Sequence, residues 1–239
     1  MGEDIWRFGA IDAADAAHQV VHHDPDASWE RIPIPADAEA ASASITALAA
    51  EFMKLPPSIR GALGRATGNA AQLSDDRLQG LAELLQNADD EGADSAFFVV
   101  DDDRLLFGHN GRDFTLPDVW GLTIPWLSEK TGKAEKLGRF GIGLKTLQSL
   151  SETLEGHNGH FHIRLGRSAM QPANDDPRWP NKPTSVTTVF VVPFQHGATT
   201  QDEVAQWLQS WGDAGLLFLR TLRMVTLLDT GGQALTRLA

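Results

Sequence analysis

The stretch from Ser74 to Asp90 constrains the fold most, because one predicted helix carries both an apolar face and a polar face. Apolar residues recur at the i, i+3, i+4, i+7 spacing that buries one side of a helix, namely Leu78, Leu81, Ala82 and Leu85. At about 100° per residue, Glu83, Asn87 and Asp90 fall together on another side. We expect Ser74 to cap the helix. Such a polar face, taken alone, is typical of simple solvation.

A second stretch, residues 138–146, reads Gly-Arg-Phe-Gly-Ile-Gly-Leu-Lys-Thr and ends where another apolar helix would begin. Its glycines let the backbone approach a phosphate closely, and the free amides of the next helix favour an anion. The formal net charge is −12, yet four of the six lysines lie nearby, namely Lys130, Lys133, Lys136 and Lys145. Their clustering indicates a local anion site, whereas the glycines alone would more often form a tight loop.

A third stretch, residues 105–114, runs from an apolar strand into a polar turn. The turn contains His109, Asn110, Gly111 and Asp113, and an Asn-Gly pair is a strong turn signal. Along the chain the order is therefore helix, hairpin and glycine turn.

In this order the three stretches resemble the N, G1 and G2 boxes of the GHKL (Bergerat-fold) ATPases. The sequence ELLQNADDEGA followed by GRFGIGLKT is most similar to the sacsin-type and ninety-kilodalton heat-shock chaperone branch. The resemblance covers roughly residues 74–230. It implies an α+β fold, a two-layer α/β sandwich whose mixed, mostly antiparallel sheet carries helices on one face.

The resemblance also implies ATP and Mg²⁺ as cofactors. ATP hydrolysis needs an oriented water, a metal on the phosphates and donors for the developing charge. The resemblance gives Glu83 the role of activating the water, and it gives Asn87 the role of binding Mg²⁺ through its amide oxygen. Residues 128–136 would form a lid over the nucleotide. The nucleotide contacts implied are Asn87, Asp90, His109, Asn110, Gly111, Asp113, Lys130, Lys133, Gly138, Arg139, Phe140, Gly141, Ile142, Gly143, Leu144, Lys145, Thr146 and Thr188.

The adenine site departs from the family pattern DxGxG. Aligning Gly111 with the first glycine puts His109 in place of the aspartate that accepts a hydrogen bond from the adenine amino group. Asp113 then replaces the second glycine. A neutral imidazole can accept one hydrogen bond but brings no negative charge. Alternatively, Asn110 or Asp113 takes this role, and Thr188 aligns with a threonine that holds adenine in relatives.

Taken as a whole, the sequence predicts one domain at residues 37–239, preceded by a peripheral segment at 1–36. Helices are expected at 37–54, 58–67, 115–127, 144–154 and 201–211, and strands at 95–100, 104–108, 160–165, 187–194, 216–219 and 222–228. The chain has no cysteine, an acidic N-terminus and no apolar run of about 18 residues, so we expect a cytoplasmic protein without a membrane span. Its net charge makes direct nucleic-acid binding an unfavoured function.

Two functions follow from the resemblance. The first is a Mg-dependent ATPase domain, slow in isolation, that belongs to a longer protein and moves the downstream domains of the same chain as ATP and ADP exchange. A nucleotide-dependent homodimer is consistent with this reading. The second is a non-hydrolysing, nucleotide-gated or degenerate interaction module. A histidine kinase is not supported, since no phosphoacceptor helix is evident.

Overall fold

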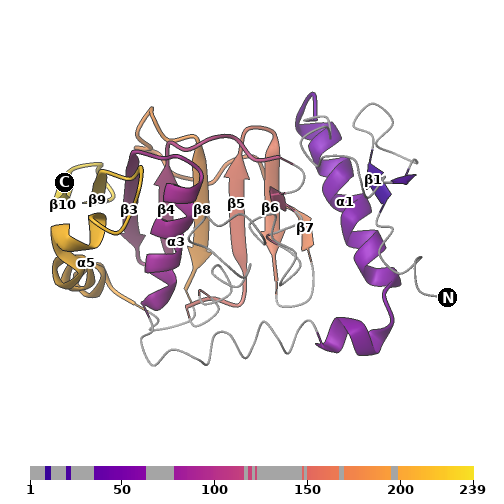
Figure 1. Ribbon diagram of the computed structural model, residues 1–239, viewed down its shortest axis with the longest axis horizontal. Coiled ribbons are helices and arrows are strands. Elements are labelled where there is room, and N and C mark those ends of the chain that lie inside the picture. The colour runs from indigo at the N-terminus through magenta and orange to yellow at the C-terminus, as the bar shows by residue number, and fades with distance from the viewer. Residues whose placement is uncertain are drawn as a thin grey trace.

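The computed structural model describes residues 9–11, 20–22, 35–62, 78–115, 118–119, 122, 147, 150–166, 170–194 and 199–239. Within them, eight strands form one sheet in the order β10-β9-β3-β4-β8-β5-β6-β7 (Figure 1). β3 and β9 pair in parallel, and the other neighbours pair antiparallel. The strands are β3 (Ser95–Asp101), β4 (Arg104–His109), β5 (Leu154–Asn158), β6 (Phe161–Leu165), β7 (Met170–Pro172), β8 (Thr188–Pro193), β9 (Met224–Leu228) and β10 (Ala234–Leu238).

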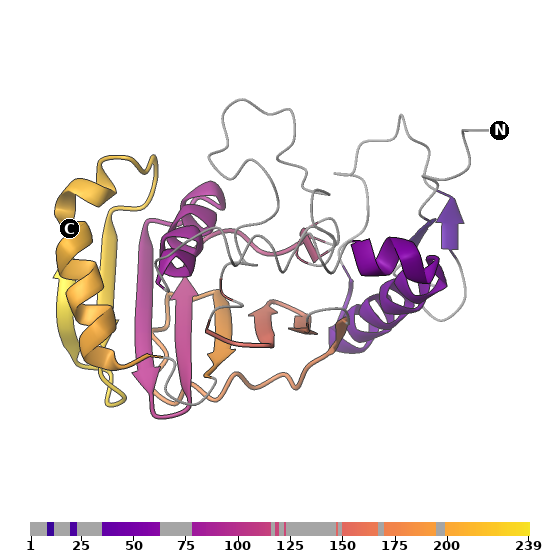
Figure 2. The same cartoon turned by 90° about the horizontal axis from the view of Figure 1, so that it is seen from below.

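The long helices lie on one face of this sheet, as Figure 1 and Figure 2 show. They are α1 (Ala38–Lys54), α3 (Gln79–Asp90) and α5 (Gln201–Leu216). α1 begins where the Asp37 carboxylate accepts the backbone N–H of Ala40, and α5 begins with a Thr200–Glu203 capping box. This confirms a mixed α and β architecture with helices on one face. None of the described helices is both long and apolar enough to cross a membrane.

Strand alternation divides the apolar residues between two cores. On β4, Leu105 and Phe107 point towards the helices, and Phe107 packs on Phe98 with ring centroids 4.8 Å apart. Leu106 points the other way, where a loop contributes Trp179 and Val186. Burial of each such side chain stabilises the fold by about 1.5–3 kcal/mol.

The helices are spread along the sheet. α5 packs against β10 and β3, and α1 packs against β6 and β7. α3 lies over β3 and β4, so the central strands β8 and β5 lie between α3 and α1 (Figure 1). Apart from this sheet, β1 (Gly9–Ile11) and β2 (Val20–His22) form an antiparallel pair of their own within the predicted peripheral segment.

Several predicted boundaries are wrong. α3 begins at Gln79 with Leu78 as its N-cap, rather than near Ser74, which lies outside the described residues. The prediction of a helix at 144–154 is wrong at its end, because Leu154 opens β5. Gly159, at φ +53°, supplies the turn that returns β5 to β6. The strand predicted at 216–219 is also wrong, since α5 continues to Leu216.

Candidate functional site

α3 buries one side and leaves its predicted polar side at the boundary with solvent. Leu81, Leu84 and Leu85 are fully buried, whereas Glu83 and Asn87 are half-buried and lie one helical turn apart. A half-buried carboxylate can still reach a ligand, and an amide beside it adds a neutral oxygen. The predicted apolar face is thus confirmed at Leu81 and Leu85, whereas Ala82 is half-buried and Leu84, which was not predicted, is buried.

The residue that follows the glycine run packs directly on the first turn of α3. A Cβ atom added to Gly80 would lie 2.7 Å from Leu147 Cδ2 and 3.2 Å from the Leu147 backbone nitrogen. Only glycine permits so close an approach of another chain segment. The run at 138–146, with Lys130 and Lys133, lies outside the described residues.

Three polar side chains lie in one row across the centre of the sheet, on the face towards the helices. The register sets His109 of β4 opposite Thr188 of β8, and Thr188 opposite Asn158 of β5. Their exposed fractions are 1%, 0% and 2%. We call these residues the polar row. His109 and Asn158 end β4 and β5, and Thr188 begins β8, so the row borders an apolar layer that includes Phe107 and Phe190.

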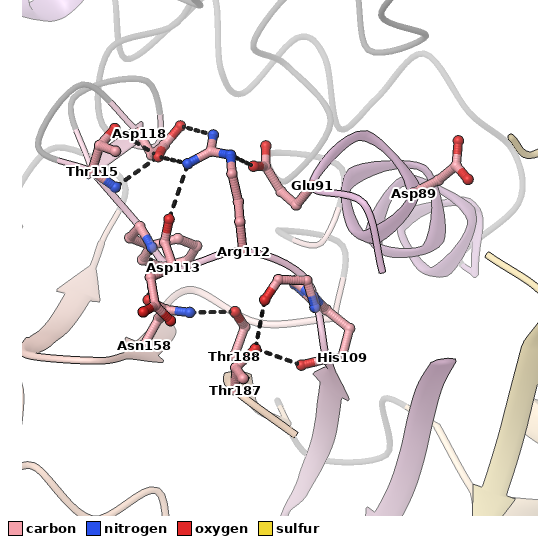
Figure 3. A network of polar contacts seen from close by, with 12 residues as sticks. Asp89, Glu91, His109, Arg112, Asp113, Thr115, Asp118, Asn158, Thr187 and Thr188 are labelled. Atoms are coloured by element: carbon pink, nitrogen blue, oxygen red, sulfur yellow. Dashed lines mark hydrogen bonds and ion pairs between the residues drawn. The ribbon is translucent and has the colours of Figure 1, made fainter. Parts of the chain in front are cut away.

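Asn158 connects the polar row to the turn after β4. Its Nδ2 donates to Thr188 Oγ1 at 2.6 Å, and its Oδ1 accepts the Phe114 backbone N–H at 2.7 Å. Figure 3 shows Asn158, Thr188 and His109 gathered below that turn. Asn158 is not among the residues predicted from the sequence, because no local signal distinguishes it from an ordinary hairpin asparagine beside Gly159.

His109 is a neutral, buried imidazole. The backbone N–H of Gly111 donates to its Nδ1 at 3.1 Å. Burial lowers the pKa of His109 to about 4, so the ring is uncharged at neutral pH. In the strand register, His109 lies opposite Thr188 of β8.

The two residues that the sequence left as alternatives to His109 lie outside the polar row. The Asn110 side chain accepts the backbone N–H groups of Asp94 and Ser95 at 3.0 and 3.1 Å, and it donates to the Asp94 carboxylate at 2.7 Å. These hydrogen bonds hold the turn against the start of β3. Asp113 is exposed, and its carbonyl accepts from the Arg112 guanidinium at 3.0 Å. Of the three candidates, only His109 contributes its side chain to the polar row.

Gly111 lies where a larger residue would not fit. A Cβ atom there would be 2.9 Å from the Glu91 carbonyl oxygen at the end of α3, and equally close to His109 Nδ1. The next residue, Arg112, forms an ion pair with Glu91 and a bidentate pair with Asp118 at 2.7 and 2.8 Å (Figure 3). The turn is therefore fixed against the C-terminal end of α3.

The acidic pair that ends α3 is held by the segment before β9. Asp89 accepts the backbone N–H groups of Arg220, Thr221 and Leu222 at 2.6–2.9 Å, and Asp90 pairs with the Arg220 guanidinium at 2.7 Å. Burial opposes ionisation of Asp89, but these hydrogen bonds keep its pKa below the ordinary value. Negative charge at a helix C-terminus is unfavourable. Two aspartates at the end of a predicted helix could therefore have indicated that each carboxylate has a partner elsewhere in the fold.

A separate polar cluster lies on the opposite face of β5 and β6. His157 Nδ1 and His162 Nδ1 are 3.1 Å apart, and His157 Nε2 is 3.5 Å from the Glu155 carboxylate. Contact with His157 and the ion pair with Arg164 lower the pKa of Glu155 to about 2. In the described part of the chain, no group of three or more His, Cys, Asp or Glu side chains is arranged to hold a metal ion.

No family model matches the sequence, and a search of curated proteins found none that matches it.

Proposed function

We propose that this chain is a GHKL-type domain that binds a nucleoside triphosphate with Mg²⁺ and hydrolyses it, ATP being the nucleotide that the resemblance implies. One observation carries the proposal. His109 and Thr188, which align with the base-binding positions of relatives, are in-register neighbours on the helix face of the sheet. The turn after His109 packs against the end of α3, the helix that carries Glu83 and Asn87.

Two further relationships support a Bergerat-type fold. α3 is followed by the β3–β4 hairpin, which is the order expected for that fold. Leu147 directly follows the glycine run in the sequence, and it packs on Gly80, one turn before Glu83. Leu147, the residue after the predicted phosphate-binding motif, therefore contacts the predicted catalytic helix.

The residues present fit the chemistry that the proposal needs. Asn87 offers an amide oxygen at the boundary with solvent, which suits a hard cation whose other ligands are phosphate oxygens and waters. When bound, Mg²⁺ would neutralise phosphate charge. Glu83 would orient a water and take up its proton on a carboxylate oxygen, a role that typically contributes about 10²–10⁴-fold. The backbone amides at 138–146 would hold the phosphates.

In a longer protein, nucleotide binding would close residues 128–136 over the site and change the position of downstream domains. Nucleotide-dependent pairing of two copies would belong to the same cycle. Hydrolysis by the chain alone would be slow, since relatives of this branch often receive a catalytic arginine from the next domain.

A second candidate is a module that binds nucleotide without hydrolysing it. The departures at His109 and Asp113 favour it, because the family carboxylate is missing from the base site. Phosphate release under single-turnover conditions separates the two functions. The ATPase proposal requires release that Glu83→Ala abolishes, whereas the second candidate requires nucleotide binding by calorimetry with equal background release from both proteins.

A further inference from the structure

His157 and His162 face each other across the β5–β6 hairpin, on the side of the sheet away from the helices. They are partners in the strand register, and their Nδ1 atoms are 3.1 Å apart. His157 also lies opposite Val189 of β8, which belongs to the apolar layer on that side. The His157 side chain is 4% exposed, whereas His162 is half-buried. The contact therefore joins an enclosed ring to a ring that solvent can reach.

The contact between the two rings depends on how many protons they carry. A neutral imidazole has one N–H donor and one acceptor nitrogen, whereas an imidazolium has two donors. A hydrogen bond between the two Nδ1 atoms is possible when both rings are neutral, and also when one ring is charged and the other accepts. When both rings are charged, two N–H groups face each other and the hydrogen bond is lost. The pair can thus hold one added proton with the contact intact, but not two.

The charged groups on the same two strands favour one added proton over two. His157 Nε2 is 3.5 Å from the Glu155 carboxylate, and among the described residues it has no hydrogen-bond partner. Contact with His157 and the ion pair with Arg164 lower the pKa of Glu155 to about 2, so the carboxylate is ionised at neutral pH. Arg164 already pairs with this carboxylate at 2.5 and 2.7 Å, which compensates most of its negative charge. What remains can favour a first added proton, and a second one is repelled.

The groups around His162 oppose its charged form. Burial lowers the pKa of His162 below its ordinary value of 6.5, and the charge of His157 lowers it further. His160, in the hairpin turn, acts in the same direction, and Asp175, in the segment after β7, acts in the opposite direction. The second proton is therefore resisted at pH values where an exposed histidine would accept it.

We propose that the His157–His162 pair is an acid-sensitive switch in the β5–β6 hairpin, closed while the rings hold at most one added proton and opened by the second. His162 turns towards solvent on opening, because the enclosed ring of His157 cannot turn. The end of β5 then loses a contact directly beside Asn158, whose side chain bonds to Thr188 and to the Phe114 amide on the other face. Acid thus loosens the hairpin next to the polar row. This inference does not depend on the proposed function.

A nuclear magnetic resonance titration of the full chain, with ¹⁵N-labelled histidines, measures the coupling directly. The ring signals of His157 and His162 are assigned from His157→Gln and His162→Gln. In the wild-type protein each ring should titrate in two steps, because each senses the proton on the other. The His157 signal should titrate in a single step in His162→Gln. Single-step curves for both rings of the wild-type protein would overturn the inference, even if a variant does not fold.

Urea unfolding at about pH 7.5 and about pH 5.5 measures the effect on stability. The unfolded chain accepts the second proton and the folded pair excludes it, so stability falls as the pH falls below the ordinary histidine pKa of about 6.5. Between the two pH values, the unfolding equilibrium constant should rise several-fold more for wild type than for His162→Gln, with an upper limit of about tenfold. Burial of His109 gives a pH dependence of the same sign, but it is present in both proteins and cancels in the comparison.

His160→Gln is the matched control, because it removes an exposed histidine from the turn of the same hairpin. Its unfolding equilibrium constant should change with pH nearly as much as that of the wild-type protein. An equal pH dependence in wild type and His162→Gln would overturn the inference, and so would an equal loss of pH dependence in His160→Gln and His162→Gln.

Discussion

Asn158 Nδ2 donates a 2.6 Å hydrogen bond to Thr188 Oγ1, and the two residues lie opposite each other on adjacent central strands. Because Asn158 Oδ1 also accepts the Phe114 amide, one side chain joins β5, β8 and the turn after β4. The polar row is therefore a built feature of the core and holds the turn that carries Gly111.

Replacement of Asn158 should destabilise the fold strongly. Asn158→Ala leaves a buried amide N–H and a buried hydroxyl without their partner, at a cost of about 1–3 kcal/mol for each group. Urea unfolding followed by tryptophan fluorescence measures this change. Asn181→Ala is the matched control, because its single bond to the Thr230 carbonyl is exposed, and it should cost less than about 1 kcal/mol. Equal effects of the two substitutions would contradict the role given to Asn158.

Gly111 should not tolerate alanine. The added Cβ would lie 2.9 Å from the Glu91 carbonyl oxygen, which is backbone and cannot rotate away. Gly111→Ala should therefore lower the free energy of unfolding by about 1–3 kcal/mol and weaken nucleotide binding, because the turn must move away from α3. Gly156→Ala is the control, since its nearest neighbours are at an ordinary 3.4 Å. A stable Gly111→Ala protein with unchanged affinity would show that the close approach is unimportant.

Asp89 should make stability depend on pH in the acid range. Hydrogen bonds from the segment before β9 lower its pKa in the folded state. Its contribution is thus present above the unfolded-state pKa of about 4, and it is lost as pH falls through the lower folded-state pKa. Asp89→Asn should remove about 1.5–3 kcal/mol at pH 7 and less at pH 3, measured by urea unfolding. The exposed Asp213→Asn should show no such difference, and a pH-independent effect at Asp89 would refute this account.

The parts of the fold that local patterns control could be predicted. The spacing of leucines indicates the buried side of α3, and α1 begins at Ala38 directly after its capping residue Asp37. β5 could not be predicted, because Leu-Glu-Gly-His-Asn has low strand propensity and forms a strand only by pairing with β6 and β8. β10 was missed for a similar reason, since it is an exposed edge strand with little apolar alternation.

In the candidate site, too, local patterns identify some residues, and others depend on contacts between distant segments. The motif spacing identified His109 and Thr188 separately, and only the strand register sets them side by side. The sequence left Asn110 as an alternative ligand, but its side chain is bonded to Asp94 and Ser95 across the turn. Asn158 depends on a contact 30 residues away in the sequence, which no local pattern encodes.

Single-turnover phosphate release by wild type and Glu83→Gln, with saturating Mg²⁺ and nucleoside triphosphate, tests the central claim most directly. Glu83→Gln keeps the size of the side chain but cannot take up a proton, so release should fall by about 10²-fold or more while affinity by calorimetry stays near wild type. Glu39→Gln on α1, an exposed carboxylate far from the polar row, should release phosphate at the wild-type rate. Equal release by wild type and Glu83→Gln, at a rate above the protein-free background, would contradict the role of Glu83 and the site built around it.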